Sequence, residues 1–350
     1  MKMTLLKKML VAVAVSATIT ACSNGAVSSI SGAGATFPLP FYNAVFGEYA
    51  LQTGIEVAYG GIGSGGGVRS LRDGVVNFAG SDACLSDEEM QQMPEVVHIP
   101  SCMGAVVLAY NIPGVETLHL SGQVIAEIYQ GIITKWNDAK LLALNPGVNL
   151  PDKNIVPVFR TDGSGTTYVF TDFLSKASPS WQAKMGTGKS VNFEVGIAAK
   201  GNPGVANSVS QTPYTIGYVG SEYAFAKKIP YANVQNARGQ MVEPTLQAIS
   251  LAASCQIPQS TCVSITYSDV PNSYPISCFT WMLVYKEQNY AGRLENQAQA
   301  NVQLLQYMLS DQAQTIAQEM NYAPLPKEVI ELSRKNIQTL TYNGMPVSVN

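Results

Sequence analysis

The chain has 350 residues, and its 21 lysines and arginines against 24 acidic residues give a formal charge of −3. This acidic balance argues against a nucleic-acid-binding protein, because such proteins carry a basic surface. Only 13% of the residues are charged and 46% are hydrophobic, which is typical of a packed globular protein. A chain of this length is expected to form two lobes rather than one core.

The first 21 residues have the pattern of an export signal. Three lysines precede a short apolar segment that ends in Ile-Thr-Ala before Cys22. The segment is too short to span a bilayer. It resembles a lipoprotein signal, in which Cys22 would be acylated and become the mature N-terminus; the alternative is a plain signal peptide with an unrelated cysteine. Residues 22–29 are small and polar, and we expect them to form a tether.

The expected location of the mature protein is the periplasm or the outer face of the cell membrane, where the lipid on Cys22 would hold it. Removal of the signal leaves 18 basic against 24 acidic residues, a formal charge of −6. An anion site in such a protein has to create its own local positive field.

Strands and helices alternate along the rest of the chain. In chain order, the predicted strands are 55–59, 75–79, 105–110, 155–159, 216–219 and 276–285. The predicted helices are 41–53, 68–73, one opening at the capping box 86–89, 124–129, one covering 168–174, 222–227 and 297–320. The alternation predicts an α/β fold that binds its ligand at the loops after the strands.

Three loops combine small polar residues with the start of a helix. They contain Thr36 with Phe37, Ser64 among glycines, and residues 160–167. A helix start leaves backbone N–H groups unpaired at the positive end of the helix dipole, so each loop is suited to an anion. A fourth loop presents Asp82 after a strand. The four loops together predict a buried oxyanion site.

Residues 160–167 read Arg-Thr-Asp-Gly-Ser-Gly-Thr-Thr and are the most informative of these loops. The guanidinium of Arg160 is a planar set of donors that matches tetrahedral or carboxylate oxygens. Asp162 is expected to orient that guanidinium. Taken alone, the loop also fits an ordinary helix cap.

Five cysteines follow Cys22, which fits an oxidising compartment. The expected disulfide joins Cys255 to Cys262 across a short loop, a second between Cys84 and Cys102 is possible, and Cys278 is then a buried thiol. Sequence alone does not fix this pairing. The two histidines lie far from any cysteine pair with ligand spacing, so no metal site is expected.

The chain resembles the phosphate-binding proteins of bacterial phosphate ABC transporters. The matching segments are GAGATFPLPFY (32–42), GIGSGGGVRSL (61–71), NFAGSDACLSDEE (77–89), VVLAYNIPG (106–114), RTDGSGTTYVFTDFLS (160–175), KGNPGVA (200–206) and IGYV (216–219). Two departures are Gly65, where many relatives carry a serine, and Cys84, where proline is common.

This resemblance implies a two-lobed periplasmic-binding-protein fold of type II. Each lobe is expected to be a mixed sheet flanked by helices, with a hinge crossing between the lobes. Residues 30–105 with 276–350 would form lobe I, and residues 106–275 would form lobe II. The implied function is a monomeric, high-affinity receptor for inorganic phosphate that delivers its ligand to a membrane permease by cleft closure, without a cofactor.

The resemblance also implies the residues of the site. In this family, backbone and hydroxyl groups of the four loops hold the oxyanion, and the matching positions here are Thr36, Phe37, Ser64, Asp82, Arg160, Ser164, Gly165 and Thr166. A carboxylate can only accept hydrogen bonds, so Asp82 would bind a proton of phosphate and repel sulfate, which has none at neutral pH.

Other functions fit single motifs. Residues 61–66 match the dinucleotide fingerprint G-x-G-x-x-G, but export and the other anion loops argue against a nicotinamide cofactor. Residues 183–190 imitate a P-loop without a preceding strand. An exported phosphatase would need a nucleophile with a base or a metal, and neither serine loop has the G-x-S-x-G elbow. A receptor for another oxyanion is the remaining alternative.

Overall fold

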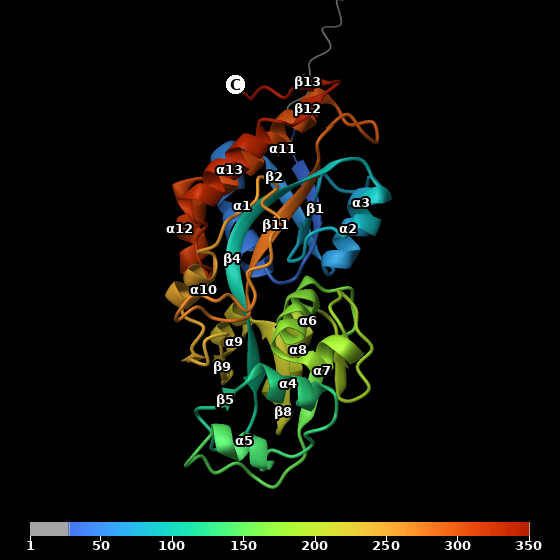
Figure 1. Cartoon of the computed structure of the whole chain (residues 1–350). Coiled ribbons are helices and arrows are strands. Elements are labelled where there is room, and N and C mark those ends of the chain that lie inside the picture. Colours follow the sequence, from blue (N-terminus) through green and yellow to red (C-terminus); the bar gives the residue numbers. More distant parts are fainter. Residues whose placement is uncertain (1–26, 28, 350) are drawn as a thin grey trace, which may run out of the picture.

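The computed structural model describes residue 27 and residues 29–349. The predicted signal peptide and Cys22 therefore lie outside the described residues. Figure 1 shows a molecule of two lobes, one above the other, with β4 (Val96–Tyr110) running from the upper lobe into the lower. The sequence had placed a strand at residues 105–110 only, so most of this strand was not predicted.

The upper lobe contains a mixed sheet. Its strand order is β2 (Glu56–Gly61), β1 (Ser29–Gly34), β3 (Phe78–Ser81), β11 (Ser277–Tyr285) and β4. β1 is parallel to β2 and to β3, whereas β11 is antiparallel to β3 and to β4. Ser29, expected as the last residue of the tether, is already part of β1.

The sheet continues through β4 into the lower lobe. There the order is β4, β8 (Thr215–Gly220), β6 (Val156–Arg160) and β7 (Ile197–Ala199), with β6 parallel to both of its neighbours. The partner of β4 changes from β11 to β8 between Ala105 and Val106. Two small sheets complete the described strands: β10 (Met241–Val242), β9 (Asn233–Gln235) and β5 (His119–Leu120), and the pair β12 (Thr341–Tyr342) and β13 (Met345–Pro346).

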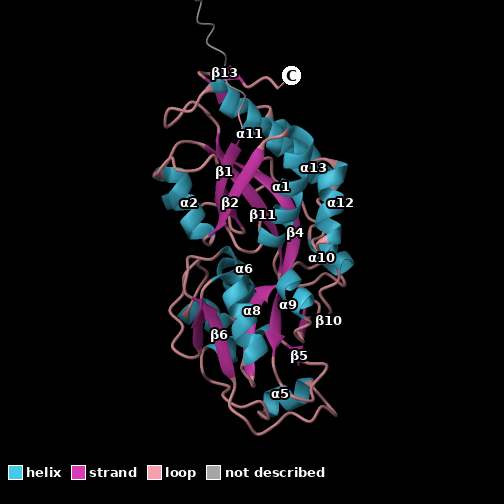
Figure 2. Ribbon diagram, turned by 180° about the vertical axis from the view of Figure 1, so that it is seen from behind, coloured by secondary structure: helices cyan, strands magenta, loops and turns pink. Residues whose placement is uncertain are grey.

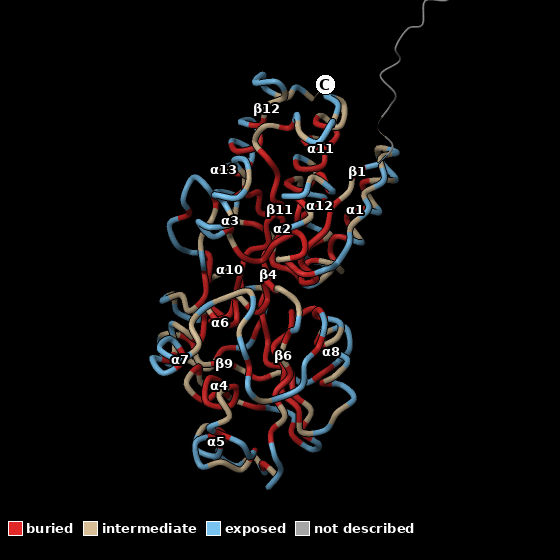
Figure 3. The backbone as a smooth tube through the Cα atoms, turned by 90° about the vertical axis from the view of Figure 1, so that its right-hand side faces the viewer, coloured by how far each residue is buried: buried red, intermediate tan, exposed pale blue. Residues whose placement is uncertain are grey.

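Helices flank both parts of the sheet (Figure 2). Those of the upper lobe are α1 (Leu39–Thr53), α2 (Ser64–Arg72), α3 (Asp87–Gln91), α11 (Glu295–Met308), α12 (Asp311–Glu319) and α13 (Lys327–Ile337). Those of the lower lobe are α4 (Gly122–Tyr129), α5 (Ala139–Leu144), α6 (Gly165–Ala177), α7 (Pro179–Lys184), α8 (Gly201–Gln211) and α9 (Ser221–Lys227), and α10 (Leu246–Ala252) packs beside β4 and β11. The central strands are buried along most of their length (Figure 3).

The helices differ from the sequence expectation in three ways. The helix predicted at 68–73 begins at Ser64, so the glycine-rich segment is itself the first turn of α2. The helix predicted over 297–320 is two helices, because Ser310 caps a new one and its hydroxyl accepts a hydrogen bond from the backbone of Ala313. The helices α5, α7, α8, α10 and α13 were not predicted. The capping box at Ser86 and Glu89 is confirmed, with both of its hydrogen bonds formed.

Of the helices that the structure describes, none combines the length and the apolar character that a bilayer crossing requires.

Candidate functional site

The predicted site residues lie at the carboxyl ends of parallel strands. In the upper lobe, Thr36 follows β1, Ser64 opens α2 after β2, and Asp82 comes directly after β3. In the lower lobe, Arg160 is the last residue of β6 and Ser164 follows it. Their side chains are all buried. Carboxyl ends of parallel strands are where open α/β sheets bind ligands, and here the ends from two lobes face each other.

The start of α6 is built as the loop sequence predicts. The hydroxyl of Ser164 caps the helix by accepting a hydrogen bond of 3.0 Å from the N–H of Thr167. The next N–H, of Gly165, donates across the lobes to the hydroxyl of Ser64 at 3.1 Å. Gly165 and Thr166 are buried in the first turn of this 13-residue helix, where backbone donors and the helix dipole favour an anion.

Two glycines allow the lobes to approach closely. Gly63 has a φ of 85°, and a Cβ there would lie 2.3 Å from a carboxylate oxygen of Asp162. A Cβ on Gly165 would lie 2.5 Å from the Ser64 hydroxyl and 2.7 Å from Oδ2 of Asp82. A side chain at either position would therefore push the two lobes apart.

Arg160 and Asp162 form a buried pair with one free donor. Nε of Arg160 donates to Oδ1 of Asp162 at 2.8 Å, and Nη2 donates to Oδ2. Burial opposes ionisation of Asp162, but the hydrogen bond and charge of Arg160 hold the pKa of that carboxyl below its usual value. Nη1 of Arg160 is buried and has no hydrogen-bond partner. The pair therefore leaves one guanidinium nitrogen available for a ligand.

Asp82 is the complementary acceptor. The hydroxyl of Thr280 donates to Oδ1 at 2.8 Å, whereas Oδ2 is buried and has no partner. Burial raises the pKa of Asp82 to about 7, against smaller lowering effects of Thr280 and Arg160. A buried acceptor and a buried donor without partners are costly unless a ligand satisfies them.

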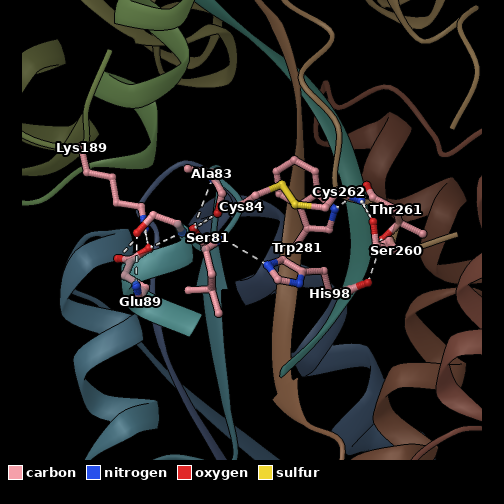
Figure 4. Close-up of a disulfide and its surroundings, with 12 residues drawn as sticks. Ser81, Ala83, Cys84, Glu89, His98, Lys189, Ser260, Thr261, Cys262 and Trp281 are labelled. Atoms are coloured by element: carbon pink, nitrogen blue, oxygen red, sulfur yellow. Dashed lines mark hydrogen bonds and ion pairs between the residues drawn. A yellow bond between two sulfur atoms is a disulfide. The ribbon is translucent and has the colours of Figure 1, made fainter. Parts of the chain in front are cut away.

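The two lobes touch around this site. The N–H of Gly65 donates to the carbonyl of Gly163 at 2.9 Å, and Tyr223 donates its hydroxyl to the carbonyl of Thr36 at 2.5 Å. Further out, Nζ of Lys189 lies 2.7 Å from Oε1 and 2.6 Å from Oε2 of Glu89. This ion pair joins the segment after α7 to α3 (Figure 4).

Both expected disulfide pairings are wrong. The structure joins Cys84 to Cys262, which are 178 residues apart in sequence, with their Cα atoms 5.9 Å apart (Figure 4). Cys255 is an exposed thiol, and Cys102 is buried inside the upper sheet. Short sequence separation suggested the other pairings, but the fold brings the segment around Cys262 against the loop that follows Asp82. Cys278 is a buried thiol, as expected.

The same segment contacts the upper lobe at a second point. Thr261 donates its hydroxyl to the carbonyl of His98 at 2.8 Å, and Nε2 of His98 accepts from the N–H of Leu85 at 3.2 Å. Burial lowers the pKa of His98 to about 4, which keeps this ring neutral and able to accept. Residues 261–262 had been assigned to lobe II, yet these contacts tie them to the loop that carries Asp82.

Sequence reasoning missed several residues around the site. Thr280 lies on β11, and Tyr218 on β8 accepts from the N–H of Arg160 and shares a hydrogen bond with the Thr167 hydroxyl. Asn202, at the start of α8, contacts hydroxyls from both lobes. Asn202 and Tyr218 lie in the matching segments KGNPGVA and IGYV, but the sequence assigned them no role, because their role depends on contacts across the fold. Only for Asn202 was there a signal, a polar residue near a helix start after a strand.

Within the described part of the chain, no three His, Cys, Asp or Glu side chains are grouped closely enough to hold a metal ion.

The fold and the site together define a class of protein, namely two-lobed binding proteins whose polar residues converge between the lobes. Residues 20–312 match the PBP superfamily domain. The chain is 39% identical over 319 residues to the phosphate-binding protein PstS of Haemophilus influenzae, covering 89% of this chain and 93% of that one. It is 33% identical over 322 residues to PstS of Methanocaldococcus jannaschii, with 85% and 83% covered. The chain therefore belongs to the PstS family of phosphate-binding proteins.

Solved structures share the two-lobed fold. A phosphate-binding protein from Stenotrophomonas maltophilia has a TM-score of 0.67 and 21% identity, covering 88% of this chain and 94% of that one. An ABC-type phosphate transport receptor from Vibrio cholerae has a TM-score of 0.57 and 18% identity, with 85% and 100% covered. At these identities the similarity concerns the fold, and it confirms the predicted two-lobed α/β architecture.

Proposed function

We propose that this protein is an extracytoplasmic receptor for inorganic phosphate that serves an ABC transporter. The relatives named above are phosphate-binding proteins, and they match most of the chain at up to 39% identity. The residues proposed to hold phosphate are Thr36, Phe37, Ser64, Asp82, Arg160, Ser164, Gly165 and Thr166, with Asp162 orienting Arg160.

One observation carries the proposal. Nη1 of Arg160 and Oδ2 of Asp82 are buried without partners, one in each lobe, beside the start of α6. Above pH 7, where Asp82 is ionised, a ligand that satisfies both has to accept from a cation and donate to a carboxylate. Phosphate with at least one proton does both, whereas sulfate at neutral pH has no proton to donate. A buried acceptor that receives no hydrogen bond from the ligand costs several kcal/mol, about 10³-fold in affinity.

The site is better suited to binding than to catalysis. A hydrolytic serine needs a base within hydrogen-bond reach. The hydroxyl of Ser64 accepts from the N–H of Gly165, and that of Ser164 accepts from Thr167, so both serine oxygens hold helix starts in place. Nε2 of His98 already accepts a hydrogen bond from the N–H of Leu85, so it is not free to act as that base. We therefore propose a receptor without enzymatic activity.

Delivery would follow from opening and closing of the lobes. We propose that residues 30–105 with 276–350 move as one lobe against residues 106–275. The segment around Thr261 and Cys262 is the exception, because the disulfide to Cys84 makes it move with the upper lobe. Phosphate would favour the closed form because both lobes contact it. A membrane permease would then recognise that form. We further propose that the receptor acts as a monomer tethered through a lipid on Cys22, on the outer side of a membrane.

Calorimetric titration of the phosphate-stripped mature protein tests the function. Phosphate is expected to bind with micromolar or tighter affinity, while sulfate at the same ionic strength produces no binding heat. The Asp82→Asn variant should bind phosphate more weakly and distinguish the two anions less. Absence of binding heat with phosphate would refute the proposal, and binding of sulfate instead would assign the site to another oxyanion.

A further inference from the structure

Asn202 occupies a central place that the predicted site does not include. It is the second residue of α8, which begins just after β7, and its side chain is fully buried. Its backbone N–H donates to the hydroxyl of Thr36 at 3.0 Å. Its side-chain Nδ2 lies 3.1 Å from the hydroxyl oxygen of Thr36 and 3.1 Å from that of Thr166. Asn202 therefore contacts one site residue from each lobe.

The orientation of the Asn202 amide follows from its third partner. The backbone N–H of Gly220, at the end of β8, donates to Oδ1 of Asn202 at 3.0 Å. A backbone N–H can only donate, so the amide oxygen has to face Gly220 and the NH₂ group has to face the two hydroxyls. Asn202 is thus a donor to Thr36 and Thr166, not an acceptor.

The hydrogen-bond capacity of the two hydroxyls then determines their direction. A hydroxyl has two acceptor positions and one proton. The oxygen of Thr36 accepts from both the N–H and Nδ2 of Asn202, so both of its acceptor positions are filled. The oxygen of Thr166 accepts from Nδ2. Neither hydroxyl proton has an acceptor among the described residues, so each is available to a ligand that accepts.

We propose that Asn202 is a positioning residue that fixes the Thr36 and Thr166 hydroxyls as donors to the bound anion. Thr36 belongs to the upper lobe and Asn202 to the lower, so the bonds to Thr36 form only when the lobes meet. Closure would thereby convert a freely rotating hydroxyl into an aligned donor. This inference rests on the phosphate receptor proposed above and adds how its donors become aligned.

A double-mutant cycle tests this inference. The variants are Asn202→Ala, Thr36→Val with Thr166→Val, and the combination, each titrated with phosphate up to millimolar concentration. Asn202→Ala alone is expected to weaken binding by about 10- to 100-fold, the effect of losing one or two hydrogen bonds to a charged group. In the background without the two hydroxyls, the same substitution should cost less than roughly threefold. If the fold losses in affinity of Asn202→Ala and of the two threonine substitutions multiply in the combined variant, the proposal is overturned.

A second variant covers the case in which Asn202→Ala fails to fold. Asn202→Asp keeps the shape and the bond from Gly220 but offers an acceptor to the hydroxyls, so it should bind phosphate at least as weakly as Asn202→Ala. Asn207→Asp adds the same charge on the exposed side of α8 and should bind like wild type. If Asn202→Asp binds phosphate with wild-type affinity, the role of Asn202 is refuted but the phosphate receptor is not. If the wild-type protein itself does not bind phosphate, the proposed receptor function is refuted as well.

Discussion

Asp82 shows how a ligand-binding side chain affects stability at the scale of a single residue. The carboxyl is buried against Thr280, and its pKa is raised by burial to about 7. An ordinary aspartate in the unfolded chain loses its proton near pH 4. Between these pH values the folded protein holds a proton that the unfolded chain has lost. The contribution of Asp82 to the free energy of unfolding therefore falls as the pH rises from about 4 to about 7 and is constant above that.

Asp82→Asn should remove this pH dependence. Asparagine can still accept from Thr280, but it carries no charge to bury. In phosphate-free buffer, the Tm of the variant is expected to exceed that of wild type by several degrees at pH 8 and by much less at pH 4. The measurement is calorimetric unfolding at the two pH values. Asp269→Asn, at an exposed position, is the control; an equal gain at both pH values for Asp82→Asn would contradict the explanation.

The site residues illustrate what sequence could and could not reveal. Thr36, Ser64 and Ser164 stand in motifs whose local physics, a polar group at a helix start, is readable from the sequence. The contacts of Asn202 and Thr280 are not readable in this way, because they join positions far apart in the chain. Asn202 and Thr36 are separated by 166 residues, and Thr280 and Asp82 by 198. Such partners follow from the fold and not from spacing.

The same distinction holds at the scale of elements. The strands β2, β3, β4, β6, β8 and β11 and the helices α1, α3, α4, α6 and α9 were predicted at least in part, because period and capping residues are local signals. The strand β1, the shorter strands and the helices α5, α7, α8, α10 and α13 were not. The early start of α2 was missed, since Gly65, Gly66 and Gly67 disfavour a helix and tertiary contacts override that preference. At Gly67, a Cβ would lie 2.5 Å from the carbonyl oxygen of Ala33, so this glycine allows the helix to pack directly on β1. The disulfide was mispredicted for the related reason that sequence proximity is a poor guide to pairing.

The ion pair between Lys189 and Glu89 is expected to favour the closed form. It joins α3 of the upper lobe to the segment after α7 in the lower lobe, and both side chains are partly buried. Lys189→Met should weaken phosphate binding roughly 3- to 10-fold and reduce its dependence on salt. Lys189 is the better target, because Glu89 also caps α3. Titration at low and high salt is the measurement.

Lys184→Met provides a matched control for this prediction. Lys184 lies five residues earlier and pairs with Glu194 at 4.0 Å within the lower lobe, where both side chains are exposed. Its loss should leave phosphate binding unchanged. If the two variants weaken binding equally, the effect is one of net charge and not of a contact between lobes.

The disulfide should stabilise the protein strongly. It closes a long loop, because its cysteines are 178 positions apart in sequence, so Cys84→Ser or Cys262→Ser is expected to cost roughly 2–5 kcal/mol in the free energy of unfolding. Cys255→Ser removes an exposed thiol and should have little effect. Denaturant unfolding of the three variants is the measurement. A large loss in Cys255→Ser would instead support the pairing expected from sequence.

For the whole molecule, the contacts between lobes predict a change of shape on binding. Without phosphate, the unpaired groups of Arg160 and Asp82 are costly in the closed form, so the open form should be populated. Phosphate should therefore reduce the radius of gyration measured by small-angle X-ray scattering, and sulfate should not. An unchanged radius with tight phosphate binding would mean that closure is complete before the ligand arrives.

The passage of β4 through both lobes has a mechanical consequence. Beside the point where its partner changes, the N–H of Val106 donates to the carbonyl of Ile276 at 2.9 Å, so two chain segments cross between the lobes as a hydrogen-bonded ribbon. A ribbon bends readily perpendicular to its plane but resists in-plane bending and sliding of one strand along the other. Bending of the ribbon therefore allows mainly one rotation of the two lobes relative to each other. The lobes would return to the same relative position after each opening, so Thr36 would meet Asn202 again each time the cleft closes.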